Sequence, residues 1–147
     1  MNKEKYIAAT PIDVLPSPYG CSLFFETSEK IFAVNMDASK YDNLKSAIDG
    51  MSGERPTTFE FFREVLASMS CKVVRVDLYN EECGIYFARV NLAVKRGEST
   101  VISEIDARPS DAVALALRCC APVYVDAEVL GRIEDTSRAY HKLKGDF

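Results

Sequence analysis

Residues 105–118 read IDARPSDAVALALR, and within this stretch the side-chain pattern changes from that of a strand to that of a helix. Residues 101–106 have the composition of a strand. Pro109 can occupy the first position of a helix, where its missing N–H costs no hydrogen bond. The segment Ser110–Cys119 is apolar almost all round, which predicts a buried helix, and Pro122 prevents that helix from continuing.

Two further strands are predicted upstream of this stretch, and a short extended piece follows it. Apolar residues alternate with polar ones over residues 74–79 and again over residues 86–94, as in half-buried strands. Residues 123–125 form the short extended piece, and Asp126 can cap a final turn that runs through Leu130.

The first half of the chain shows a similar order of strands and helices. Strands are predicted near Tyr6–Leu15, Cys21–Glu26 and Lys30–Met36. One helix opens at Ser39, and a second opens at Thr57. Each opening residue has an acidic residue three positions later, which is the spacing of a capping box.

The two halves resemble each other, which predicts an internal duplication. Aligning Asp37 with Asp106 also aligns Asp42 with Asp111. We therefore expect an α+β fold of two βββαα repeats, at about residues 6–69 and 72–131, whose strands form one curved, barrel-like sheet packed with helices. Residues 1–131 are expected to form a single domain and residues 132–147 a short charged tail. The predicted core includes Leu44, Ile48, Phe62, Leu66, Val113, Leu115 and Leu117.

The composition is that of one soluble globular domain, with 147 residues, 48% hydrophobic and 27% charged. No apolar run is long enough to cross a membrane and the start is not of the secretory type, so we expect a cytoplasmic protein without a membrane partner. Five cysteines without CxxC spacing favour reduced thiols. The net charge of −4 does not favour strong nucleic-acid binding, although nucleic acid is still considered as a partner, and a homo-oligomer stays open.

Candidate catalytic residues lie in and around residues 105–118. The chain has one histidine, His141, near its end, which disfavours histidine-based nucleophilic catalysis. Glu104 and Asp106 are two apart on a strand, so their side chains leave the same face, and Asp111 follows in the first helical turn. These three carboxylates are the predicted catalytic residues. Glu104 and Asp106 are the candidate ligands of a divalent metal such as Mg²⁺ or Mn²⁺, and no organic cofactor is expected.

Two arginines complete the predicted site, and a purely structural role is the alternative. Arg89 and Arg108 could bind phosphate, helped by the positive end of the helix dipole. Alternatively Asp111 caps its helix, and Asp106 pairs with one of the arginines to hold the junction.

Several segments resemble the bifunctional nuclease domain family. They are Gly84–Val90, Ile105–Arg118, Ala121–Val123 and Glu128–Leu130, within a resemblance that covers about residues 12–131. The resemblance implies activity on both RNA and DNA and a duplicated β3α2 fold.

The first half departs from the family pattern. The family usually has Pro-Ile-x-Ile-Gly-x-x-Glu where this chain has residues 33–40, AVNMDASK, and Thr-His-Asp where it has residues 58–60, TFE. A glycine, a glutamate and a histidine are thus missing. Two functions follow as hypotheses: a metal-assisted nuclease that hydrolyses RNA or DNA, or a non-catalytic interaction or regulatory module on the same fold.

Overall fold

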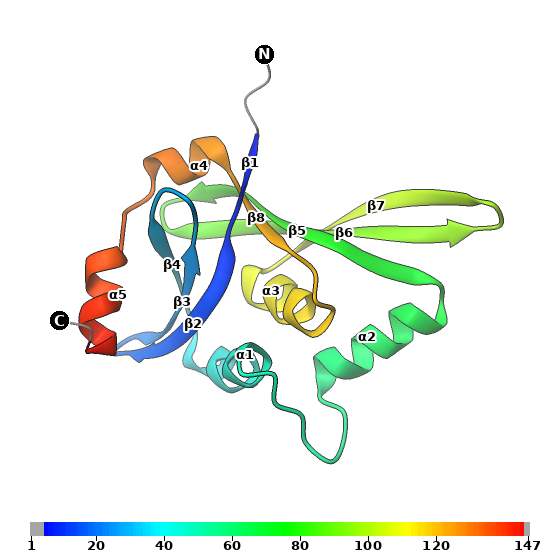
Figure 1. Cartoon of the computed structure of the whole chain (residues 1–147), viewed down its shortest axis with the longest axis horizontal. Coiled ribbons are helices and arrows are strands. Elements are labelled where there is room, and N and C mark those ends of the chain that lie inside the picture. The colour runs from blue at the N-terminus through cyan, green and yellow to red at the C-terminus, as the bar shows by residue number, and fades with distance from the viewer. Residues whose placement is uncertain (1–4, 146–147) are drawn as a thin grey trace.

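The computed structural model describes residues 5–145, and their strands form two separate sheets (Figure 1). The smaller sheet is antiparallel and contains β2 (Thr10–Ser17), β3 (Gly20–Glu26) and β4 (Ile31–Met36). The larger sheet has the order β1-β8-β5-β6-β7. Its strands are β1 (Tyr6–Ala8), β5 (Cys71–Glu82), β6 (Ile85–Arg96), β7 (Ser99–Ala107) and β8 (Val123–Asp126).

Three of the helices lie together on one side of the larger sheet, where α3 is central (Figure 1). The helices are α1 (Tyr41–Ile48), preceded by the 3-10 turn η1 (Ala38–Lys40), α2 (Thr58–Ser68), α3 (Pro109–Arg118), α4 (Ala127–Arg132) and α5 (Ser137–Lys144). None of the helices in the described residues is long and apolar enough to cross a membrane.

Residues 105–118 form the end of a strand and a helix, as their sequence predicts. β7 ends at Ala107, and Pro109 is the first residue of α3. Every residue from Ala112 to Ala116 is buried, so α3 forms the centre of the core between α1, α2 and the strands β5 and β6. The predicted cap of α4 is confirmed, because the Asp126 carboxylate accepts the backbone N–H groups of Glu128 and Val129.

The expectation of one curved, barrel-like sheet is wrong. The strand predicted over residues 6–15 divides at the buried Ala9, whose N–H donates to the Val123 carbonyl at 2.8 Å. β1 therefore pairs with β8, whereas β2 pairs with β3.

The free edge of β4 is bound by the C-terminal segment instead of by another strand. The N–H and the hydroxyl of Thr136 both donate to the Ile31 carbonyl, at 2.7 and 3.0 Å. The Ser137 hydroxyl accepts the Ile31 N–H, and the ring of Tyr140 lies 4.9 Å from that of Phe24. Residues of the predicted charged tail thus form α5, which begins at the edge strand β4 and crosses the sheet toward β2, where Lys144 pairs with Asp13 at 2.9 Å.

The predicted duplication is not confirmed and stays a prediction. Three strands followed by two helices occur twice along the chain, but β8 interrupts the second set. The strands of the first set form their own sheet, while those of the second set join β1 and β8.

The predicted core is confirmed at its centre, confirmed in part at its margin and wrong at Phe62. Leu44, Val113 and Leu115 are buried, whereas Ile48, Leu66 and Leu117 are only partly buried. Phe62 is 44% exposed, because its face of α2 borders an open groove next to the sheet.

The opening of α2 shows the predicted capping box. The Glu60 carboxylate accepts the backbone N–H and the hydroxyl of Thr57 and the hydroxyl of Ser52. These hydrogen bonds, with the Thr57 N–H first, lower the pKa of Glu60 to about 2. At the opening of the first helical segment the prediction is wrong by two residues, because Asp37 rather than Ser39 caps η1.

Candidate functional site

Four side chains gather on the face of the larger sheet that points away from α1, α2 and α3. Arg89 comes from β6 and lies opposite Asp106 of β7 in the register of the two strands. Its Nη1 donates to Glu104 Oε2 at 3.0 Å, and its guanidinium lies 4.2 Å from the centre of the Tyr79 ring. The Tyr79 hydroxyl donates to Asp106 Oδ1 at 2.6 Å. We call Tyr79, Arg89, Glu104 and Asp106 the carboxylate cluster.

Hydrogen bonds orient the side chains of the carboxylate cluster. The hydrogen bond to Asp106, reinforced by desolvation, raises the pKa of Tyr79, so this hydroxyl remains a neutral donor. Glu104 is 55% exposed and can meet a ligand from solvent. The buried Nε of Arg89 has no hydrogen-bond partner among the described residues. A buried donor without a partner costs about 1–3 kcal/mol, which the ion pair with Glu104 and the contact with the Tyr79 ring partly offset.

A second polar network supports the carboxylate cluster from the same face. The buried Asp77 carboxylate accepts hydrogen bonds from Arg75 at 2.7 Å and from Asn91 at 2.9 Å. The Arg75 guanidinium in turn lies over the rings of Tyr6 and Tyr124, at 4.9 and 4.3 Å from their centres. Such a network holds the neighbouring strands β5, β6 and β8 in one arrangement.

The other two predicted residues lie at the start of α3. Arg108 is the N-cap residue, and its Nε lies 3.3 Å from Asp111 Oδ2. Its side chain is 75% exposed and lines a cleft of about 320 Å³ that Lys40 also lines. Asp111 pairs with Arg108, and no side chain of the described residues caps the start of α3.

The structure therefore groups Arg89, Glu104 and Asp106 on one sheet face, whereas Asp111 pairs with Arg108 and lines, together with Asp106, a groove of about 220 Å³ beside α2 and α3. No three His, Cys, Asp or Glu side chains within residues 5–145 are grouped so that they could hold a metal ion. Glu104 and Asp106 are carboxylates, the ligand type through which proteins often bind Mg²⁺ in ones or twos together with the phosphates of a substrate.

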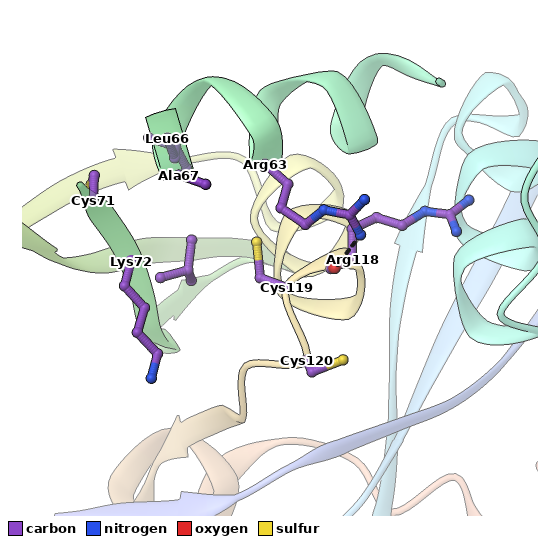
Figure 2. A pocket seen from close by; sticks show the side chains of 9 residues that line it. Arg63, Leu66, Ala67, Cys71, Lys72, Arg118, Cys119 and Cys120 are labelled. Atoms are coloured by element: carbon purple, nitrogen blue, oxygen red, sulfur yellow. Dashed lines mark hydrogen bonds between the residues drawn. The ribbon is translucent and has the colours of Figure 1, made fainter. Parts of the chain in front are cut away.

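A cleft between α2, β5 and the end of α3 holds a different group of chemically active side chains (Figure 2). They are Arg63, Cys71, Lys72, Arg118, Cys119 and Cys120. Arg63 donates to the Arg118 carbonyl at 3.0 Å, and Arg118 donates to the Met51 carbonyl at 2.8 Å. Burial raises the pKa of the Cys119 thiol. The arginines thus tie α2 and α3 together, and this cleft is not the candidate active site.

Comparison with known proteins places the chain among nuclease domains. A sequence model described as "Bifunctional nuclease domain" matches residues 23–137. An uncharacterized protein of Mycobacterium tuberculosis is 31% identical over 83 residues, which are 56% of this chain and 46% of that protein. "Bifunctional nuclease 1" of Arabidopsis thaliana is 31% identical over 83 residues, and "Bifunctional nuclease 2" of Oryza sativa subsp. japonica is 34% identical over 84. In both plant proteins the match spans 25% of their length and 56% of this chain.

Proposed function

We propose, since the chain belongs to the bifunctional nuclease domain family, that it hydrolyses phosphodiester bonds of RNA or DNA at the carboxylate cluster. One observation carries this proposal. Glu104 and Asp106 stand on one face of β7, and each is held by a separate partner, Arg89 and Tyr79 respectively. Two oriented carboxylates at an exposed sheet face are a suitable platform for a metal-bound phosphate.

The proposed roles follow from these contacts. A divalent ion such as Mg²⁺ or Mn²⁺, held by Glu104 and Asp106, would polarise the phosphate and activate a water molecule. Arg89 holds the Glu104 carboxylate in position, and Tyr79 does the same for Asp106. Preorganised groups of this kind need little rearrangement when substrate arrives.

Arg108 is proposed to bind a phosphate of the nucleic-acid backbone beside the scissile bond. It lies two residues beyond Asp106, and its backbone is still extended, with φ −68° and ψ 144°. A planar, exposed guanidinium next to a helix N-terminus is well suited to phosphate oxygens. Asp111 keeps this guanidinium oriented until a phosphate takes the place of the Asp111 carboxylate.

The first-half positions that depart from the family pattern lie outside the carboxylate cluster but beside its surroundings. Asp37 and Lys40, at the positions of the missing glycine and glutamate, line the cleft of Arg108, and Phe59, at that of the missing histidine, lines a groove that Asp106 also lines. Phe59 and Glu60 replace the histidine and aspartate of the family pattern, and both belong to α2 on the helical side of the sheet. The Glu60 carboxylate is used in the capping box. The roles proposed above are assigned to residues of the second half of the chain.

A non-catalytic interaction module is the second candidate function. The net charge of −4 favours it, because nucleic-acid binding draws mainly on positive charge. The cluster carboxylates are also already paired within the protein.

A cleavage assay decides between the two functions. The purified chain is incubated with end-labelled single-stranded and double-stranded RNA and DNA, with Mg²⁺, with Mn²⁺ and with chelator. The nuclease proposal expects cleavage that chelator abolishes and added metal restores. Absence of cleavage with every substrate and metal would favour the interaction module.

A further inference from the structure

β7 is an edge strand with an unusually apolar surface. In the described part of the chain it pairs with β6 on one side and with no strand on the other. The hairpin of β6 and β7 projects beyond the helices (Figure 1). Val101, Ile102 and Ile105 on this strand are 44%, 57% and 50% exposed. A long, apolar, open edge favours pairing with another strand unless the protein blocks it.

The hairpin geometry shows which backbone groups face the open edge. The turn has two residues, Gly97 and Glu98, and is closed by the pair Arg96 and Ser99. In a hairpin of this type the closing residues exchange both backbone hydrogen bonds, and every second pair along the ladder repeats this. The residues between those pairs direct their N–H and C=O groups away from β6: Thr100, Ile102, Glu104 and Asp106.

We propose that a second copy of the chain pairs with β7 in antiparallel orientation, about a two-fold axis at Ser103. Ile102 then lies opposite the partner's Glu104, and Thr100 lies opposite the partner's Asp106. All of these residues have outward-facing backbone groups, so the two strands form a regular ladder. On the helical face of the sheet, Val101 meets the partner's Ile105, which covers exposed apolar surface on both copies.

Charge selects this register over its neighbours. An axis at Ile102 would place Glu98 opposite the partner's Asp106, and an axis at Val101 would place it opposite the partner's Glu104. An axis at Glu104 would bring two copies of that carboxylate face to face. Like charges directly opposite each other destabilise a strand pair. The axis at Ser103 instead brings Glu98 to the partner's Arg108, twice in each dimer.

The same pairing extends the apolar groove beside β7. This groove has a volume of about 220 Å³ and is lined mainly by apolar side chains of α2, α3, β6 and β7, Ile105 among them. In the dimer the two grooves lie next to each other beneath one continuous sheet, whose opposite face carries both carboxylate clusters. The inference rests on β7 and does not depend on the proposed hydrolysis.

The first test is the mass of the protein in solution without nucleic acid, by sedimentation equilibrium over a concentration series. We expect twice the 16.4 kDa of one chain at the upper concentrations. The variant Ile102→Pro removes an outward N–H but leaves the bonds to β6, and it should weaken dimerisation by about tenfold or more. A single-chain mass at every concentration would overturn the proposal.

The second test fixes the register. Residues that face each other across a two-fold axis come close enough for a disulfide, so Ser103→Cys should give a covalent dimer on mild oxidation. The wild-type protein with its five free cysteines, and Thr100→Cys, are the controls and should stay uncrosslinked. Glu98→Arg should weaken the dimer, and Arg108→Glu in the same chain should restore it. Crosslinking at Thr100→Cys instead of Ser103→Cys would refute the register.

Discussion

The variant Glu104→Gln is expected to separate catalysis from stability. Glu104 and Arg89 form an ion pair at 3.0 Å, with side chains that are 55% and 30% exposed. Pairs this exposed contribute about 0.2–1 kcal/mol, and glutamine can still accept the arginine N–H. A loss of up to about 1 kcal/mol shifts the melting temperature of a chain this long by about 2–4 °C. Loss of a positioned catalytic carboxylate lowers the rate by about 10²–10⁴-fold.

The assay measures both quantities on the same preparations. Melting is followed by circular dichroism, and cleavage is followed with a labelled oligonucleotide under single-turnover conditions. Glu64→Gln is the matched control, because Glu64 is 68% exposed and pairs with Arg63 at 3.1 Å away from the carboxylate cluster. The control should melt and cleave like the wild type. A Glu104→Gln protein that cleaves at the wild-type rate would refute the role of this carboxylate.

Four other variants test the phosphate contact, an acid-sensitive cap and the core. Arg108→Ala should weaken oligonucleotide binding and lower the salt dependence of binding by about one phosphate contact, as measured by fluorescence anisotropy in a salt series. The melting temperature should hardly change, because the ion pair between Arg108 and Asp111 is exposed. The pKa of Glu60 is lowered to about 2, so its contribution to stability is present above its ordinary value of 4.5 and is lost as the pH falls toward 2. Glu60→Gln should therefore flatten the decline in unfolding free energy between those two pH values, and an unchanged decline would count against the capping box. Leu115→Ala should lower the unfolding free energy by about 2–5 kcal/mol in urea titrations, and Leu117→Ala by less because that side chain is only partly buried.

Local chemistry allowed most of the second half to be predicted from the sequence. Pro109 at the first helical position and Asp126 as a cap act on neighbouring backbone groups, so their effect does not depend on the rest of the fold. Alternating side chains likewise identified β5 and β6. Glu104 and Asp106 came together because two residues on one strand share a face whatever the sheet does.

Features that depend on distant contacts could not be predicted. The division of the first strand at Ala9 depends on a hydrogen bond to Val123, far along the chain. Tyr79 of β5 joins the carboxylate cluster through its hydrogen bond to Asp106 of β7, across the intervening strand β6. Only the place of Tyr79 in the alternating pattern of β5 could have indicated that its side chain lies on the same sheet face as the cluster. The exposure of Phe62 follows from how α2 lies against the sheet, which its own periodicity does not specify.

The most direct test of the proposed site is the cleavage rate of Asp106→Asn with saturating Mg²⁺, measured against the wild type at equal concentrations of folded protein. Asparagine keeps the size of the side chain and an acceptor for the Tyr79 hydroxyl, but it removes the charge that would bind the metal. The rate should be at least about 10²-fold lower, with the fold unchanged by circular dichroism. Cleavage at the wild-type rate, or cleavage that persists in chelator, would contradict the proposed site.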